Sequence, residues 1–380
     1  MNIALFSDTY YPEINGVATS VYQLKIGLEK LGHKVYVFTT ASPNYKSLDN
    51  EYRVFSIPFV LMKDRRASLP IYLKWLRIIK KLNIDIIHTH TEFSFGVLGM
   101  RVAKKLNIKH IHTYHTIYED YLHYLKLPKN KHTIKFVQAA SRLYCNKTTE
   151  IVAPSEKTKK LLEEYGITTE VTVIPTGIDL DKFTYIDYSK VSKLRKEYNI
   201  TDNEVIMLSV SRLSKEKDVD KSVLIFSKLF KKYFNIKLII VGDGPYRKEL
   251  EILVDTLNLQ DRVFFTGYVS WDEIQNYYAI GNIFLSSSTS ETQGLTYLEA
   301  LAAKLYLLVK RDDSLVGILE DVNSCYSFTN YEEFLEGYEK ILKKLESRNS
   351  PIINERYSQE GYAKNIESIY MKYIEKIDEK

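Results

Sequence analysis

Short β-rich runs alternate with amphipathic helical stretches along the whole of this 380-residue chain. In the first half the runs extend from "NIALFS" (2–7) to "VTVIPT" (171–176), with helical segments such as "SVYQLKIGLEKLG" (20–32) between them. The second half repeats the scheme, from "VIMLSVSRL" (205–213) to "LYLLVKR" (305–311). Alternation of this kind is typical of doubly wound parallel sheets. The pattern therefore predicts an α/β protein built from two Rossmann-like domains.

A polar stretch near the middle of the chain predicts where the two domains meet. This stretch, "TGIDLDKFTYIDYSKVSK", begins at residue 176 and has no apolar period. We expect an N-terminal domain over residues 1–178, a C-terminal domain over 179–360, and a final helix over 361–380 that packs back on the N-terminal domain. Because open parallel sheets bind ligands at the carboxyl ends of their strands, the two domains are expected to face each other across a ligand-binding cleft.

Charge is distributed unevenly between the two halves. Residues 1–180 contain 25 Lys and Arg against 16 Asp and Glu, whereas the remainder contains 28 against 32. A basic domain joined to a mildly acidic one indicates that the first meets an anionic surface. No apolar run reaches the roughly 18 residues of a transmembrane helix, and the start "MNIALFSDTYY" lacks the features of a signal peptide. The expected location is the cytoplasm, peripheral on the inner face of the cell membrane.

Two carboxylates flank a glycine in "SETQGLTYLEA" (290–300), between an apolar run and a predicted helix. Gly294 stands where the helix should begin, so the first amides and the positive end of the helix dipole favour an anion there. Glu291 precedes this point, and Glu299 follows it by roughly 7.5 Å along the helix axis. A nucleotide sugar has a matching layout, with a diphosphate between sugar hydroxyls and ribose hydroxyls that carboxylates can bind.

Cations for the diphosphate are predicted on the turn after another strand. In "SVSRLSKEKDVD" (209–220), Arg212 and Lys217 lie at the entrance of a helix. The forked guanidinium and the compact ammonium both suit a diphosphate. The turn "VGDGP", which contains Gly242, follows the next strand. Taken alone it is a tight turn of a kind that many sheets contain.

The two acids have other interpretations. Glu299 alone could be a solvated helix residue, and Glu291 a first-turn acid that stabilises the helix dipole. Together they could form the acid pair of a glycosidase. The neighbouring cations favour the nucleotide sugar, because a hydrolase needs no phosphate site between its two carboxylates.

The chain resembles the retaining family-4 glycosyltransferases, which have the GT-B fold. "ETQGLTYLE" has the E-x7-E spacing of that family, and "SRLSKEKDVD", "VGDGP", "FFTGYVSWDEI", "IVAPSEKTKKLL" and "VIPTGIDLDKF" match its other blocks. The resemblance covers nearly the whole chain. It implies that Arg212 and Lys217 hold the donor diphosphate, that Glu291 binds the sugar and that Glu299 binds the ribose.

The same resemblance implies a wider set of site residues. The loop "YYPEINGVATS" is similar to the family's glycine loop and would bring Gly16 to the phosphates or the acceptor. It is not a GxGxxG fingerprint, which argues against an NAD enzyme. The residues implied in donor binding are Gly16, Arg212, Lys217, Gly242, Tyr268, Glu291, Thr292, Gln293, Gly294, Leu295 and Glu299. Those implied in catalysis are His115, Glu291, Arg212 and Lys217.

A histidine-rich block, "HIHTYHTIYEDYLHY" (110–124), closely resembles the corresponding segment of bacterial diacylglycerol 3-glucosyltransferases. In the wider family the histidine that matches His115 lies beside the reacting end of the donor sugar. Alternate positions of a strand share a face, so the pairs His88/His90 and His110/His112 could instead be metal ligands. No Cys or Glu-x-x-His partner completes such a site. We expect neither a metal nor a cofactor.

The stretch "VLMKDRRASLPIYLKWLRIIKKL" (60–82) is predicted to bind the membrane. A helix with Trp75 on an apolar stripe and basic residues on another face suits an anionic lipid surface. The alternative is a domain helix with a solvated face. Nucleic acid is disfavoured, because no recognised binding module accompanies the charge. The basic residues of this prediction are Lys63, Arg65, Arg66, Lys74, Arg77, Lys80 and Lys81.

One stretch departs from the family pattern. After "EALAAK" the family usually has a Gly-Pro turn and later an Asn-Gly loop, where this chain has "LYLLVKR" and "VNSCYSF". Taken together, the resemblance implies a retaining transferase that moves glucose from UDP-glucose to the hydroxyl of diacylglycerol. A polyprenyl-linked glycan or a phosphatidylinositol are alternative acceptors. A non-catalytic partner subunit is the alternative of another class, although such a subunit would be expected to lose some of the site residues.

Overall fold

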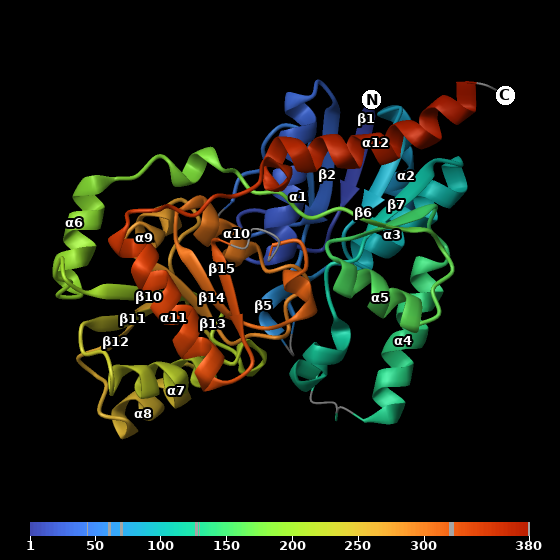
Figure 1. The fold of residues 1–380 in the computed structure, drawn as a ribbon. Helices are drawn as coiled ribbons and strands as arrows, with labels where there is room; N and C mark the ends of the chain where they lie inside the picture. Colours follow the sequence, from blue (N-terminus) through green and yellow to red (C-terminus); the bar gives the residue numbers. More distant parts are fainter. Residues whose placement is uncertain are drawn as a thin grey trace. The chain divides into compact units, whose positions relative to one another are not determined.

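The computed structural model describes residues 1–43, 45–59, 62–68, 71–125, 128, 130–318 and 323–378, without the side chains of 59, 62–65, 67, 121, 123–125 and 375–378. The chain forms two compact units (Figure 1). Unit 1 is Met1–Ile178 with Glu355–Lys380, and unit 2 is Asp179–Asn354. Unit 2 ends before residue 360, because the backbone after Asn354 already pairs with unit 1. The Ile178 amide donates to the Tyr357 carbonyl, and the Gln359 amide donates to the Ile178 carbonyl.

The centre of unit 1 is a parallel sheet with the strand order β3-β2-β1-β6-β7-β8-β9. Its strands alternate between two cores, as the runs of apolar residues predict for a sheet covered on both faces. In β1, Ile3 and Leu5 face one core while Ala4 and Phe6 face the other. The strands are β1 (Asn2–Phe6), β2 (Lys34–Thr40), β3 (Glu51–Val54), β6 (Ile86–Thr89), β7 (Lys109–Thr113), β8 (Glu150–Ala153) and β9 (Val171–Val173), with a separate antiparallel pair β4 (Ile57–Phe59) and β5 (Met62–Ala67).

Helices cover both faces of this sheet. The first face is covered by α1 (Gly16–Lys30) and the C-terminal helix α12 (Gln359–Asp378), which pack against each other (Figure 1). The contact is close, because a Cβ on Gly27 of α1 would lie 2.6 Å from Ala363 Cβ of α12. The second face carries α2 (Tyr72–Lys81), α3 (Ser94–Leu106), α4 (Lys131–Cys145) and α5 (Glu156–Glu164).

Unit 2 is a second parallel sheet, with the strand order β12-β11-β10-β13-β14-β15. On one face α7, α8 and α11 share a core with the strands, and on the other α9 and α10 pack around Phe284 of β13. The elements are α6 (Tyr188–Glu197), β10 (Val205–Val210), α7 (Val219–Phe230), β11 (Ile236–Val241), α8 (Arg247–Thr256), β12 (Val263–Gly267), α9 (Ile274–Tyr278), β13 (Ile283–Ser286), α10 (Leu295–Ala302), β14 (Tyr306–Lys310), β15 (Cys325–Phe328) and α11 (Tyr331–Glu346).

Both sheets therefore confirm the predicted fold class, two Rossmann-like parallel sheets wound on both faces. The stretch that departs from the family pattern still forms β14 and β15. Lys304, in the turn before β14, takes the left-handed conformation that glycine adopts most easily, with φ 67°. That conformation costs a non-glycine residue about 1–2 kcal/mol, which the surrounding sheet offsets. Residues 319–322 of this stretch lie outside the described part of the chain.

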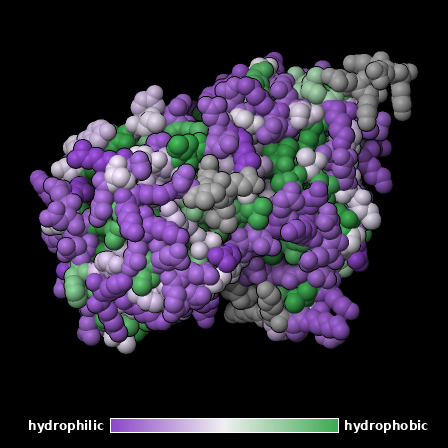
Figure 2. Space-filling model, in the orientation of Figure 1, coloured by the Kyte–Doolittle hydropathy of each residue, from purple (hydrophilic) through white to green (hydrophobic). Residues whose placement is uncertain are grey.

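Within the described residues, no helix is both long enough and apolar enough to cross a bilayer. The face of the molecule drawn in Figure 2 is mostly hydrophilic, with hydrophobic residues exposed singly or in small groups.

Candidate functional site

The predicted donor residues gather at the carboxyl edge of the unit 2 sheet. The chain leaves β10 toward β11 and β12, then returns to β13 on the other side of β10. The loops after β10 and β13 diverge there, and such a switch point is where doubly wound sheets bind ligands. Arg212 and Lys217 follow β10, and Glu291 and Gly294 follow β13. The structure therefore brings together two groups that are far apart in the sequence.

Lys217 and Glu291 are in direct contact. Lys217 Nζ donates to Glu291 Oε1 over 2.7 Å, and each side chain is only 17% exposed. Ser288 Oγ donates to the same carboxylate oxygen over 3.0 Å. Lys217 ends a 3₁₀ turn (Lys215–Lys217), and the left-handed Asp218 is the N-cap residue of α7. The cation predicted for the diphosphate and the acid predicted for the sugar thus form one ion pair.

The turn that carries Arg212 is held by the turn after β11. The Leu213 amide donates to the Asp243 carbonyl over 3.0 Å, and the Ser211 amide donates to the Val241 carbonyl over 3.1 Å. The approach requires glycine at Gly242, where φ is 134° and a Cβ would lie 2.0 Å from the Ser211 carbonyl oxygen. The weak "VGDGP" signal therefore marks a real backbone contact. Gly242 positions the Arg212 turn.

Gly294 ends the loop after β13 and precedes α10, as predicted. Its φ of 79° is left-handed, and a Cβ there would lie 2.5 Å from the Tyr297 ring. No side chain of the described residues caps this end of α10. The first amides of the helix therefore point toward the sheet edge, where they favour an anion.

Glu299 lies within α10, and its carboxyl group is held by α9. Tyr278 OH donates to Glu299 Oε2 over 2.8 Å. Burial raises the pKa of Glu299, against the Tyr278 hydrogen bond and the charge of Lys182, which lower it. Burial also lowers the pKa of Lys182 to about 8, against the Glu299 charge, which raises it. Lys182 Nζ lies 3.2 Å from the centroid of the Trp271 ring.

The other predicted donor residues of unit 2 lie on the same edge, whereas Gly16 belongs to unit 1. Gln293 is buried, and Thr292 and Leu295 are half-buried beside Gly294. Tyr268, just past the end of β12, is 66% exposed. The sequence also missed residues of this site, among them Ser288, Tyr278 and Lys182. The "SSSTS" run after β13 was a possible signal for Ser288, but no local pattern shows that Tyr278 and Lys182 meet Glu299.

Unit 1 has its own switch point, between β1 and β6. Asp8 follows β1 and accepts hydrogen bonds from Thr91 Oγ1 at 2.5 Å and from Ser94 Oγ. Gly16 begins α1, where the Asn15 side chain accepts from the Ala18 amide over 3.0 Å. Gly16 is exposed, so its backbone is open to a ligand at this edge. The sequence did not identify Asp8.

His115 follows β7 at the same edge and contacts His90, which follows β6. A hydrogen bond of 3.0 Å joins His115 Nε2 to His90 Nδ1, and the two rings are stacked with centroids 5.3 Å apart. Burial lowers the pKa of His115 to about 3 and that of His90 well below its usual value. Both imidazoles are therefore neutral at physiological pH. His115 can exchange hydrogen bonds with a ligand but cannot supply a positive charge.

The other histidines of the two pairs that were the alternative metal ligands, His88, His110 and His112, bond to protein groups. His88 bonds to Tyr370 OH at 2.6 Å and to Thr113 Oγ1 at 2.7 Å. His110 Nε2 and His112 Nδ1 share Thr89 Oγ1, and His112 Nε2 bonds to Glu92 Oε1 at 3.1 Å. Among the described residues no group of three or more His, Cys, Asp or Glu is placed to hold a metal ion.

The basic segment 60–82 differs from the prediction in one respect. Trp75 is not available to a membrane, because it is 4% exposed and packs edge-on against Phe38 with centroids 5.7 Å apart. The apolar stripe of α2, with Trp75 and Ile79, packs in the core. The exposed side of the helix carries four basic residues together with Leu73, which is 62% exposed. Arg66 donates to the Ser56 hydroxyl and carbonyl. The side chains of Lys63 and Arg65 lie outside the described residues, and those exposed are Lys74, Arg77, Lys80 and Lys81.

Two family models match this chain, one over most of unit 1 and the other over most of unit 2. Residues 14–182 match Glycosyltransferase Family 4, and residues 190–357 match Glycosyl transferases group 1. An alpha-monoglucosyldiacylglycerol synthase of Streptococcus pneumoniae is 37% identical over 98% of this chain and 86% of its own length. The enzyme of the same name from Acholeplasma laidlawii is 35% identical over 100% and 99% of the two chains.

Solved structures agree with the fold. Sucrose-phosphate synthase of Thermosynechococcus elongatus superimposes with a TM-score of 0.75 at 20% identity, over 98% of each chain. Anabaena HepE in complex with UDP superimposes with a TM-score of 0.69 at 19% identity, over 100% of this chain and 99% of its own. The chain therefore belongs to the family-4 glycosyltransferases and has the GT-B fold.

Proposed function

We propose that this chain is a retaining glucosyltransferase that moves glucose from UDP-glucose to the hydroxyl of diacylglycerol at a membrane surface. The observation that carries the donor side is the Lys217–Glu291 ion pair beside the Gly294 end of α10, at the switch point of the unit 2 sheet. The acceptor comes from the two bacterial relatives, whose names give monoglucosyldiacylglycerol as the product. Neither half of the proposal rests on fold likeness alone.

The donor would bind along the carboxyl edge of the unit 2 sheet. Its diphosphate would meet Arg212, Lys217 and the first amides of α10, which together oppose the negative charge of UDP. Glu299 would bind the ribose hydroxyls, and Glu291 those of the sugar, where it would share Lys217 with the phosphates. Because these cations and amides are preorganised, no metal ion is needed to stabilise the leaving group.

The reaction would exchange one glycosidic bond for another on the same face of the sugar. The bond between glucose C1 and the β-phosphate oxygen breaks, and a bond from C1 to the diacylglycerol oxygen forms. The hydroxyl proton passes to an oxygen of the leaving diphosphate, which departs as UDP. Neutral His115, with its ring held by His90, would exchange hydrogen bonds with a ligand at the carboxyl edge of the unit 1 sheet.

The membrane side of the proposal rests on charge. The exposed residues Lys74, Arg77, Lys80 and Lys81 of α2 would attract the enzyme to anionic lipid, each with about 1 kcal/mol. This would place the protein on the inner face of the cell membrane, where the lipid acceptor resides. Phosphatidylinositol is a second candidate acceptor, because one chain of the human phosphatidylinositol N-acetylglucosaminyltransferase is 26% identical over 97% of this chain and 75% of its own length.

A transfer assay tests the whole proposal. Purified protein would receive UDP-glucose, UDP-galactose, UDP-N-acetylglucosamine or GDP-glucose together with diacylglycerol, phosphatidylinositol or a polyprenyl-linked glycan in mixed micelles. We expect α-linked glucosyldiacylglycerol from UDP-glucose, with the anomer identified by NMR and the rate unchanged by EDTA. Transfer only to another acceptor would refute the diacylglycerol assignment, and binding without transfer of any sugar would indicate a partner subunit.

Glu299→Gln should weaken the binding of UDP without unfolding the protein. The glutamine keeps the shape and can still accept from Tyr278, but a charged hydrogen bond to ribose, worth about 1.5–3 kcal/mol, becomes a neutral one. We expect the Kd for UDP to rise about tenfold or more in titration calorimetry. Tyr278→Phe is the matched control, since it leaves the carboxylate in place and should weaken UDP less. Unchanged UDP affinity in Glu299→Gln would remove Glu299 from the nucleotide site.

A further inference from the structure

Three neighbouring helices on one face of the unit 1 sheet contain no acidic residue. Trp75 of α2 and Val102 of α3 share one core, and Val97 of α3 borders the core around Tyr144 of α4, so the helices lie side by side. Their segments carry ten Lys and Arg, all exposed, and no Asp or Glu. The ten are Lys74, Arg77, Lys80, Lys81, Arg101, Lys104, Lys105, Lys131, Lys135 and Arg142.

The other helices of unit 1 have mixed charge. On the opposite face, α1 contains the pair Lys25–Glu29 and α12 the pair Lys364–Glu360. Beyond α4, the helix α5 begins with Glu156. A solvated helix face ordinarily intersperses both signs. The helices α2, α3 and α4, which have no acidic residue, therefore form a basic surface that attracts anions.

The helix α4 adds an apolar stripe to this surface. Phe136 is 72% exposed and Leu143 is 65% exposed, with exposed Ala139 and Ala140 between them at helical spacing. The inner face of the same helix is already buried, because Tyr144 and Cys145 pack in the core. The outer stripe is a second apolar face, which an ordinary domain helix does not need.

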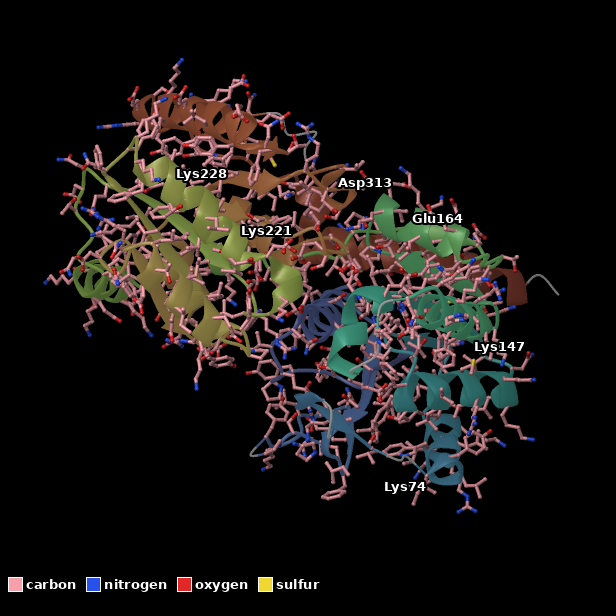
Figure 3. The ribbon with its side chains drawn as sticks, turned by 90° about the horizontal axis from the view of Figure 1, so that it is seen from below. Lys74, Lys147, Glu164, Lys221, Lys228 and Asp313 are labelled. Carbon is pink, nitrogen blue, oxygen red and sulfur yellow. The ribbon has the colours of Figure 1, made fainter. Side chains whose placement is uncertain are left out.

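Basic side chains frame the stripe on α4. Exposed Lys135 precedes Phe136 in the chain, and exposed Arg142 precedes Leu143. Lys147, labelled in Figure 3, follows the end of the helix. The Arg142 guanidinium donates to the Tyr165 carbonyl over 3.2 Å, which ties that side chain to the body of unit 1. The acidic residue Glu119 also contacts α4, where it accepts a hydrogen bond from the half-buried Gln138 and not from a residue of the exposed stripe. An apolar stripe between cations matches the layers of an anionic bilayer, with acyl chains below and phosphates above.

We infer that α4 inserts its Phe136–Leu143 stripe into an anionic phospholipid surface, while α2 and α3 contact the headgroups. The inference deepens the proposed function, since it names the element that holds the enzyme on the lipid that contains its acceptor. Trp75 is buried and does not contribute, so the aromatic anchor of this surface is Phe136 of α4.

Two exposed apolar pairs give a matched test in the full-length protein. Phe136→Ser with Leu143→Ser removes the stripe, whereas Phe234→Ser with Ile252→Ser removes side chains of unit 2 that are 63% and 64% exposed. We expect the α4 variant to sediment about tenfold or more weakly with phosphatidylglycerol–phosphatidylcholine vesicles. Its residual binding should vanish at high salt, because only the electrostatic attraction of α2 and α3 to the lipid is left and salt screens that attraction. The unit 2 variant should bind as the unaltered protein does.

A second variant reports insertion directly. Phe136→Trp should be quenched by lipids brominated on their acyl chains when the protein is vesicle-bound. Vesicle binding of the α4 double variant equal to that of the unaltered protein, or a bound Phe136→Trp that is not quenched, would overturn the inference. Transfer to acceptor in detergent micelles separates this outcome from the proposed function. Micellar transfer should persist in the α4 variant, and its absence from the unaltered protein would refute the function alone.

Discussion

Replacing Lys217 by alanine should lower the kcat of sugar transfer by about 10²–10³-fold, the usual effect of removing one preorganised group that stabilises a leaving charge. Lys217 Nζ lies 2.7 Å from Glu291 Oε1, so the variant also removes this cation from the Glu291 carboxylate, beside the proposed diphosphate site. Arg212→Ala should have a similar effect. Because both are proposed to stabilise one leaving group, the double variant should lose less than the product of the single losses. Steady-state kinetics with saturating donor measures each value.

Lys215→Ala is the control for this series. Lys215 lies on the same 3₁₀ turn as Lys217 but is exposed, with its Nζ 5.9 Å from the Tyr246 ring centroid. Its removal should leave kcat within about twofold, as surface substitutions usually do. A Lys217→Ala enzyme as fast as Lys215→Ala would contradict the role of Lys217. That result would favour a bound divalent ion as the group that stabilises the leaving diphosphate.

Unit 1 should lose stability steeply below about pH 6.5. Burial lowers the pKa of four histidines, to about 3 for His110 and His115 and well below the usual value for His88 and His90. The unfolded chain therefore takes up protons that the folded unit does not, and stability falls as the pH drops from about 6.5 toward 3. At pH 5.5 each histidine removes on the order of 1 kcal/mol of unfolding free energy, and the four together several kcal/mol. That loss is comparable with the whole stability of an ordinary domain.

Fluorescence can follow this loss in unit 1 alone. The chain has two tryptophans, the buried Trp75 in unit 1 and Trp271 in unit 2, so a Trp271→Phe background reports on unit 1. Urea titrations at pH 7.5 and 5.5 give the two free energies of unfolding. Asp8 acts in the opposite sense, because burial raises its pKa and protonation then favours the folded state.

Two histidine variants check the origin of the pH dependence. In His110→Gln the loss of unfolding free energy between pH 7.5 and 5.5 should shrink by on the order of 1 kcal/mol, since one proton fewer is taken up on unfolding. His132→Gln is the control, because His132 is exposed on α4 and its replacement should change nothing. An unfolding free energy that is equal at the two pH values would show that the cluster does not stay neutral in the folded unit.

The sequence alone determined the elements and the positions of the local motifs. The hydrophobic periods of strands and helices depend on residues close together in the sequence. The alternation that predicts two Rossmann-like sheets can therefore be recognised without any tertiary contact. The same holds for Gly294, whose left-handed conformation ends a loop and begins α10, and for the spacing that places Glu299 within that helix. Lys304 shows the limit of such rules, because it holds a glycine-like conformation that the surrounding sheet enforces.

Only the tertiary structure decided which side chains meet. The ion pair Lys217–Glu291 joins the ends of β10 and β13, which become neighbours through the strand order rather than through the sequence. The His90–His115 bond depends in the same way on β6 lying beside β7. Helical periodicity shows that two faces of a helix differ, but packing decides which of them meets the sheet. For that reason the sequence misplaced Trp75 at a membrane and did not identify the exposed stripe of α4.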